Sequence, residues 1–152
     1  MAIFKRTLLP LLALFLLLFP VSWSLAQSPA PAFDQRGFTA FVNWFSSLDR
    51  NEQFARIKFP LKVRNNMSEC GSDPVWEEKY YQAGEVGDWY KLLLSEEELA
   101  EEKLIRRIED LSPTKKLVVE ILDGAGYMQE FEFTWDGGSW NLTEIRYPSG
   151  GC

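Results

Sequence analysis

Four glutamates are the residues of this sequence with the clearest potential for acid–base chemistry. Glu130 and Glu132 are two positions apart in a segment that alternates like a β-strand, so their side chains share one face. Glu120 and Glu144 lie in the two segments expected to flank that strand. Two carboxylates at a suitable separation, one with a raised pKa, can hydrolyse a glycosidic bond. Because the same alternation predicts the solvated face of an antiparallel sheet, we favour that interpretation over catalysis.

The residue types that are missing narrow the chemistry further. None of the 152 residues is histidine. Ser-His-Asp and Cys-His catalysis and almost every zinc enzyme site are therefore excluded. The sequence also has no Gly-rich phosphate motif, Cys-x-x-Cys pair or nucleophile elbow. We expect a protein that is not an enzyme and has neither a cofactor nor a metal site.

Aromatic residues are the second group that could have a function. Their rings offer a large apolar contact area with few rotatable bonds, which suits a pocket for a sugar, lipid or peptide. Phe131 and Phe133 alternate as core residues do, and we assign them to a packed core. The residues predicted to bind a ligand are Trp44, Trp89, Tyr90, Trp135 and Trp140.

The first 26 residues have the pattern of a signal peptide. Lys5 and Arg6 precede an apolar run, Pro20 breaks it, and small residues at positions 24 and 26 fit a cleavage site after Ala26. An uncleaved membrane anchor is the alternative, but the run is shorter than the roughly 20 residues that span a bilayer. We expect an exported, soluble protein in the periplasm or outside the cell.

Cleavage would also make the protein more acidic. The segment holds two basic and no acidic residues, so its removal changes the formal net charge from −6 to −8. An acidic domain repels the phosphates of nucleic acids and anionic lipids. Neither nucleic acid nor a membrane is therefore an expected partner of the mature chain.

Two cysteines, Cys70 and Cys152, lie in the part that would be exported. An even number of cysteines in an oxidising compartment favours a disulfide, here between the tail and the loop that begins at Cys70. Two free thiols or an intermolecular bridge are the alternatives.

The N-terminal part of the mature chain predicts a linker and then helices. Residues 27–33 are expected to be a disordered linker, followed by a single domain over residues 34–152. Apolar residues three and four apart predict a helix over 38–48, and Asn51 can cap a short helical turn after it.

The next segment changes to the two-residue period of a strand. Apolar residues alternate from 57 to 64, and Pro60 would confine this strand to a sheet edge or a bulge. Two further short strands are predicted over residues 75–82 and 88–94.

A second helix and three strands complete the predicted domain. Ser95 and Glu98 form a capping box before apolar residues at near-helical spacing, which predicts a helix through Leu111. Strands over 115–123, 127–135 and 140–147 are separated by Asp-Gly turns, and a bulge near Thr143 would bring both halves of the last strand into phase. The predicted class is α+β, with N-terminal helices packed on a curved antiparallel sheet that ends in this three-stranded meander.

Two stretches of the sequence resemble known proteins. Residues 131–145 contain a strand, a glycine turn and a Trp-x-Leu-x-x-Ile strand, and they resemble the final hairpin of nuclear transport factor 2-like (cystatin-like) domains. The residues from Phe41 to Leu61, including Gln53-Phe54 and Arg56-Ile57, resemble exported bacterial proteins of the domain of unknown function 4348 family. The resemblance implies a curved sheet backed by helices around a pocket, but no activity.

These observations favour a binding protein. We expect an exported non-catalytic domain that holds a small molecule, a glycan or a protein partner in a sheet-lined pocket or on its acidic surface. One alternative is a carboxylate-dependent hydrolase that acts on carbohydrate. The other is an inhibitor or immunity-type protein that presents its acidic face to a basic target. A cavity on the concave face of the sheet, and the residues that reach into it, would discriminate between them.

Overall fold

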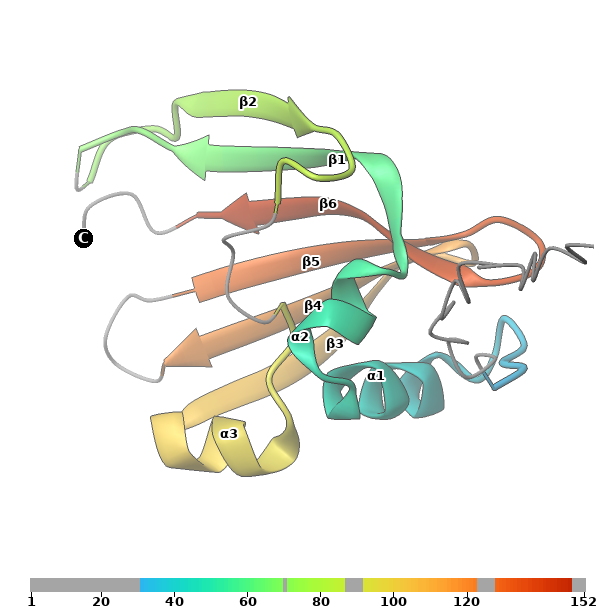
Figure 1. Cartoon of the computed structure of the whole chain (residues 1–152). Helices are drawn as coiled ribbons and strands as arrows, with labels where there is room; N and C mark the ends of the chain where they lie inside the picture. The colour runs from blue at the N-terminus through green and yellow to red at the C-terminus, as the bar shows by residue number, and fades with distance from the viewer. Residues whose placement is uncertain (1–30, 70, 87–91, 123–127, 149–152) are drawn as a thin grey trace, which may run out of the picture.

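A curved six-stranded sheet forms the centre of the molecule in the computed structural model, which describes residues 31–69, 71–86, 92–122 and 128–148 (Figure 1). Its strand order is β2-β1-β6-β5-β4-β3. The strands are β1 (Ile57–Asn66), β2 (Trp76–Tyr81), β3 (Leu104–Ser112), β4 (Lys115–Leu122), β5 (Met128–Trp135) and β6 (Trp140–Tyr147). The predicted α+β class is confirmed, but the sheet is mixed rather than antiparallel because β1 and β6 run parallel.

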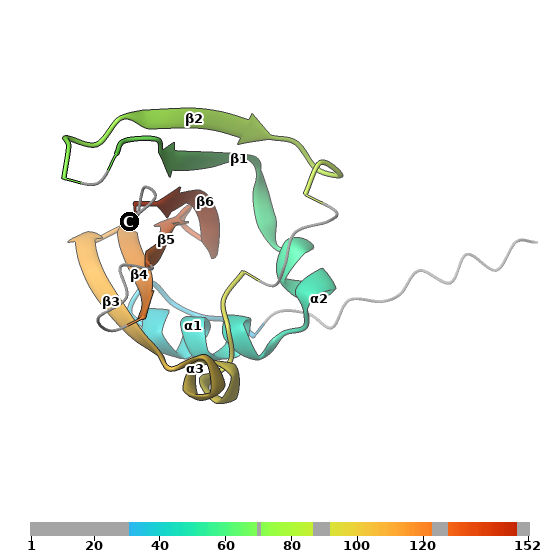
Figure 2. The same ribbon diagram turned by 90° about the vertical axis from the view of Figure 1, so that its left-hand side faces the viewer.

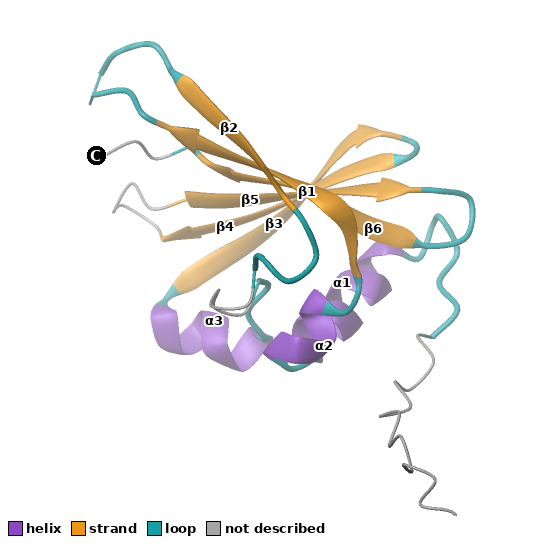
Figure 3. Ribbon diagram, turned by 45° about the horizontal axis from the view of Figure 1, so that its top comes forward, coloured by secondary structure: helices purple, strands orange, loops and turns teal. Residues whose placement is uncertain are grey.

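Three helices cover one face of this sheet (Figure 3). They are α1 (Phe38–Ser47), α2 (Arg50–Phe54) and α3 (Glu96–Glu102). The sheet curls around them when it is viewed from its end, with β2 and β3 at its two edges (Figure 2). The first helix is the one that the spacing of apolar residues predicts.

The hydrophobic core lies between α1 and the strands β5 and β6. Phe41 and Phe45 pack edge-on against Phe133, with ring centroids 5.5 and 5.7 Å apart. Aromatic pairs at this geometry stabilise a core beyond the area that they bury. The assignment of Phe131 and Phe133 to the core is confirmed, because both side chains are completely buried.

The cap of α2 differs from the prediction. Asp49, not Asn51, is the N-cap: its carboxylate accepts from the backbone N–H of Glu52, and Glu52 accepts from the N–H of Asp49. This reciprocal capping box satisfies two N–H groups that the helix itself leaves free. Helix α2 therefore begins at Arg50, two residues earlier than it would with Asn51 as its N-cap.

The strand β1 contains Pro60 but is not an edge strand. It lies between β2 and β6, and its register against β6 shifts between Ile57 and Lys62. Pro60 falls within this shift, where a missing N–H costs no ladder bond. Of the two predicted possibilities, the bulge is the one found.

The predicted helix through Leu111 is wrong beyond Glu102. Lys103 adopts the left-handed conformation, with φ 58°, and ends α3. The next nine residues pair with β4 as the edge strand β3. Their apolar side chains have near-helical spacing because the edge strand leaves them exposed, so burial does not impose the alternation of a strand.

The C-terminal meander agrees with the prediction, and its bulge is at the expected residue. Glu132 faces Glu144 and Phe133 faces Leu142, which leaves Thr143 as the extra residue. The capping box of Ser95 and Glu98 is also confirmed.

Two other expectations concern segments that are only partly described. Residues 92–94 are not a strand, and residues 88–91 of that prediction lie outside the described residues. The predicted turn from Asp123 to Gly126 lies outside them as well. Among the residues described, no helix is long and apolar enough to cross a membrane.

The linker prediction needs one correction at its end. Phe33, its last residue, is half-buried and packs against Phe41 and Trp44. Packing of the domain therefore includes Phe33 and does not start at residue 34.

Gln53 joins the helices to the segment that precedes α3. Its side chain is completely buried. The amide nitrogen donates to the carbonyl oxygens of Phe45 and Leu93, at 3.1 and 2.8 Å. The amide oxygen accepts from the backbone N–H groups of Leu92 and Leu93, at 2.9 and 3.1 Å. All the hydrogen-bonding capacity of this buried amide is therefore used.

We expect Gln53→Leu to lower the free energy of unfolding by about 2–4 kcal/mol, because it leaves several buried backbone groups without a partner. Gln82→Leu, at an exposed position, is the matched control and should change it by less than about 0.5 kcal/mol. Urea denaturation followed by circular dichroism measures both. Equal effects of the two substitutions would contradict the role given to Gln53.

Candidate functional site

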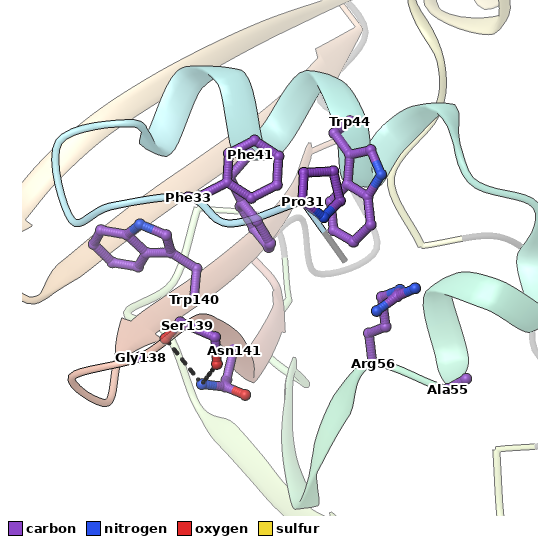
Figure 4. A pocket seen from close by; sticks show the side chains of 10 residues that line it. All are labelled: Pro31, Phe33, Phe41, Trp44, Ala55, Arg56, Gly138, Ser139, Trp140 and Asn141. Atoms are coloured by element: carbon purple, nitrogen blue, oxygen red, sulfur yellow. Dashed lines mark hydrogen bonds between the residues drawn. The ribbon is translucent and has the colours of Figure 1, made fainter. Parts of the chain in front are cut away.

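A cleft of about 260 Å³ opens between the start of the domain, α1, the end of α2 and the turn between β5 and β6 (Figure 4). Ligand sites in proteins are concave, largely apolar and equipped with a few polar groups. The residues that line this cleft are Pro31, Phe33, Phe41, Trp44, Ala55, Arg56, Gly138, Ser139, Trp140 and Asn141.

Aromatic rings form the apolar wall of the cleft. Phe33, Phe41 and Trp44 contact one another, with ring centroids 5.4 to 5.9 Å apart. Trp140 packs edge-on against Phe38 of α1, with centroids 4.6 Å apart. Because these rings are held by the core behind them, the wall is formed before any ligand binds.

Two nitrogen-bearing side chains give the cleft polarity. The guanidinium carbon of Arg56 lies 4.8 Å from the ring centroid of Trp44, in a cation–π contact. The indole nitrogen Nε1 of Trp140 is buried and has no hydrogen-bond partner among the described residues. A buried N–H without a partner is uncommon in a folded protein, and here it belongs to a residue that lines the cleft.

The turn that forms the other side of the cleft is organised by Asp136. One carboxylate oxygen accepts from the backbone N–H groups of Gly138 and Ser139, at 3.1 and 3.0 Å, and these bonds lower the pKa of Asp136. The other oxygen accepts from the side-chain amide of Asn141 at 3.0 Å. Gly137 has φ +96°, a conformation that side chains rarely adopt. The hydrogen bonds to Asp136 and the conformation of Gly137 therefore fix the shape of the turn beside the cleft.

The structure brings together two of the five residues predicted to bind a ligand. Trp44 and Trp140 both line the cleft. Trp135 packs against Trp140, with ring centroids 5.5 Å apart, and is not among the lining residues. Trp89 and Tyr90 lie outside the described residues.

Sequence reasoning missed Phe33 and Arg56 as lining residues. Phe33 was assigned to the linker because it precedes the first periodic pattern. Arg56 stands just after α2 and before the first strand, where an exposed cation needs no special explanation. No short-range signal shows that the loop between two C-terminal strands lies opposite both residues.

The four candidate glutamates do not form one group. Glu120 is paired in register with Gln129 and therefore lies on the helix-covered face, opposite to Glu130 and Glu132. Its side chain is 1 % exposed. The expectation that Glu120 belongs to a solvated face is therefore wrong, and none of the four is among the residues that line the cleft.

Glu120 instead forms a buried ion pair with Arg106 across β4 and β3. Its oxygen accepts from Nη2 of Arg106 at 2.6 Å and from the backbone N–H of Leu94 at 3.3 Å. Arg106 also donates to the carbonyl oxygen of Leu94 and to Glu96. Burial raises the pKa of Glu120 above its ordinary value of 4.5, although the hydrogen bond from Arg106 acts in the opposite direction. The pair thus holds the segment before α3 against the strands β3 and β4.

The other three glutamates surround Arg146 on the uncovered face of the sheet. Arg146 donates to Glu144 at 2.6 Å and to Glu130 at 3.4 Å, and it also binds Glu132. Glu132 accepts in addition from Lys115 at 2.7 Å. Each of these carboxylates is paired with a cationic side chain. The predicted polar face is therefore a network of ion pairs and not a row of unpaired carboxylates.

The network continues to the edge strand β2. Lys62 and Arg64 of β1 both bind Glu78 of β2, at 2.9 and 3.1 Å. The hydrogen bond to Glu78 raises the pKa of Lys62. Arg64 also stacks on Trp76, with its guanidinium carbon 4.6 Å from the ring centroid. This second Arg–Trp contact lies outside the cleft.

Two further expectations can be placed against the structure. Cys70 and Cys152 lie outside the described residues, so the disulfide stays a prediction. Within the described ranges, no group of three or more acidic or sulfur ligands is arranged to hold a metal ion.

Comparison with known proteins gives similarity in fold only. No family model and no curated protein matches the chain, so the resemblance to the domain of unknown function 4348 family stays a prediction. The chain is similar to the solved structure of an NTF2-like protein from Bacteroides fragilis NCTC 9343, with 17 % identity, a TM-score of 0.48 and 80 % of the chain covered. It spans about half of the length of that protein (50 %).

A second similar structure is a cystatin-like protein from Bacteroides caccae ATCC 43185. Its identity to the chain is 19 % and the TM-score is 0.44, over 73 % of this chain and 75 % of the other.

We expect Arg106→Met to lower the free energy of unfolding by about 3–5 kcal/mol at pH 7, because it leaves the Glu120 carboxylate buried without its cation. The loss should be smaller near pH 4.5. Without Arg106 the pKa of Glu120 rises further in the folded state, so the folded protein keeps a proton that the unfolded chain releases above pH 4.5. The free energy of unfolding of this variant therefore falls as the pH rises.

Two variants control this measurement. Glu96→Gln removes a partner of Arg106 that is 77 % exposed and should have little effect. The double substitution Arg106→Met with Glu120→Leu removes both charges and should recover the part of the loss that comes from the unpaired carboxylate, while the backbone groups of Leu94 lose these partners. A double variant as unstable as Arg106→Met would show that the unpaired charge of Glu120 is not the cause.

Proposed function

We propose that this chain is an exported, non-catalytic binding domain whose cleft takes a small flat molecule that carries a hydrogen-bond acceptor. The observation that carries the proposal is the buried Nε1–H of Trp140, which has no partner in the described part of the chain and belongs to a residue that lines the cleft. An acceptor on a ligand would satisfy this donor, and the loss of such a bond is costly in a buried site.

The shape and charge of the cleft support a ligand of this class. A volume of about 260 Å³ suits a molecule of one or two rings rather than a long chain. Trp44 and the phenylalanines beside it offer flat apolar contact, and Arg56 next to Trp44 supplies positive charge. A carboxylate on an aromatic or other ring is the acceptor that best fits these groups.

Non-catalytic binding fits the cleft better than carboxylate chemistry does. The glutamates that could act as acid and base are committed to Arg106 or Arg146, and they lie away from the cleft. The residues that do line it include aromatic rings, a guanidinium, a hydroxyl and an amide. These groups bind and orient a ligand.

Binding can be tested with a panel of aromatic carboxylates, their neutral amides and simple sugars, measured by ligand-observed NMR and calorimetry. Indole-3-acetate and indole-3-acetamide are a matched pair that differs in charge. We expect Trp44→Ala to weaken binding of the carboxylate about ten-fold, because it removes one wall. Arg56→Gln should reduce the preference for the carboxylate over the amide.

The Arg64–Trp76 contact offers a matched control for each of these variants. Trp76→Ala and Arg64→Gln make the same changes in the same kind of pair, but outside the cleft, and should leave affinity unchanged. The proposal fails if no compound of the panel binds, or if Trp76→Ala weakens binding as much as Trp44→Ala does.

Export is the second part of the proposal and has its own test. The basic residues, the apolar run and the small residues before position 27 support cleavage after Ala26. Intact mass spectrometry of the protein recovered from the periplasm of an expressing bacterium should give a chain that begins at Gln27. Without reductant its mass should be lower by two hydrogens, from a Cys70–Cys152 bond. A full-length mass, or two free thiols, would contradict the respective part.

A further inference from the structure

The outer edge of β3 has no neighbouring strand within the described residues (Figure 2). Such an edge presents a row of backbone N–H and C=O groups that can pair with another chain. β3 is nine residues long, which is longer than most strands. Its free edge is therefore large enough to pair with another strand over several residues.

This strand also carries an unusual share of exposed apolar side chains. Six large hydrophobic residues are exposed in the described part of the chain, and three of them, Ile105, Ile108 and Leu111, belong to β3. Their exposed fractions are 43, 37 and 47 %. An exposed edge strand with apolar side chains is a candidate interface.

The sequence of β3 is complementary to itself when it is read in the opposite direction. In an antiparallel pair of two β3 strands centred on Ile108, Arg107 of each copy faces Glu109 of the other. The two Ile108 side chains meet at the axis, and Ile105 of each copy lies near Leu111 of the other, the residue at which the register of β3 shifts. Opposite charges and apolar residues placed directly across an antiparallel pair stabilise it.

Arg107 and Glu109 are also the charges of β3 that remain available. Arg106 is bound to Glu120, and Asp110 is bound to Lys116 at 2.6 Å. Arg107 and Glu109 are exposed, and neither side chain has an ion-pair or hydrogen-bond partner among the residues that the structure describes. Both lie on the uncovered face of the sheet, on the same side as Ile105.

The opposite edge of the sheet is less suited to pairing with a second copy. On β2, Glu78 is bound by Lys62 and Arg64 of its own chain, and Lys79 lies over the ring of Tyr81. Two of the three charged side chains of β2 thus already have partners within the molecule. An antiparallel pair of two β2 strands centred on Glu78 would place Glu77 opposite Lys79, but it would also bring the two Glu78 carboxylates together at the axis, which is unfavourable.

We propose that two copies of this chain form a dimer by antiparallel pairing of their β3 strands about a two-fold axis at Ile108. The sheet then continues from one copy into the other, and both free β3 edges disappear. Two Arg107–Glu109 pairs and two Ile105–Leu111 contacts flank the axis. A two-fold interface of this kind uses the same surface of both subunits, as most homodimers do.

Sedimentation velocity of the purified protein over a range of concentrations tests the proposal, with charge reversals on β3 as variants. Arg107→Glu places two glutamates together, because the new carboxylate faces Glu109 of the other copy, and Glu109→Arg places two arginines together. Each should raise the dimer dissociation constant about ten-fold or more. An equimolar mixture of the two variants should dimerise again, because the heterodimer brings the new glutamate of one copy opposite the new arginine of the other.

Glu77→Arg, on the edge strand β2, is the matched control and should leave the dimer unchanged. Circular dichroism checks that every variant is folded. A wild-type protein that stays monomeric at the highest concentration would overturn the proposal. A dimer that both single reversals leave intact, or a mixture that fails to restore association, would overturn it as well, since association would then use another surface.

Discussion

The buried amide of Gln53 is the interaction on which the arrangement of helices and sheet depends. Residues 92–95 cross the covered side of the sheet without regular secondary structure, so their backbone polar groups need partners from elsewhere. Gln53 bonds the N–H groups of Leu92 and Leu93 and the carbonyl oxygen of Leu93, and Arg106 with Glu120 satisfies both groups of Leu94. An irregular segment is thereby fixed between α2 on one side and β3 and β4 on the other.

Different interactions stabilise the two faces of the sheet. The covered face is held by aromatic packing between α1 and β5. The uncovered face is held by cross-strand ion pairs centred on Arg146, where burial lowers its pKa but the neighbouring glutamates outweigh that effect and raise it. The cleft lies where the aromatic layer reaches the end of the sheet, so its wall is an extension of the core rather than a separate structure.

Sequence reasoning succeeded where one face of an element is buried and failed where none is. The meander and the bulge at Thr143 were predictable because Phe131 and Phe133 impose a strict two-residue period. β3 was mistaken for a helix because the edge of the sheet imposes no such period, and the decisive interaction, between Arg106 and Glu120, joins two strands. Two residues of the cleft, Trp44 and Trp140, could be predicted because their side chains are aromatic. The position of Arg56 could not, because it depends on how distant segments of the chain pack together.

The parallel pairing of β1 with β6 has a consequence for the order of folding. β1 comes early in the chain and β6 is its last strand, and α1 likewise packs against residues of β5 and β6. The N-terminal half therefore cannot complete its core during synthesis until the C-terminal hairpin has emerged, and contacts of such long sequence separation form slowly. A chain of this topology therefore stays without its complete core until β6 has been synthesised.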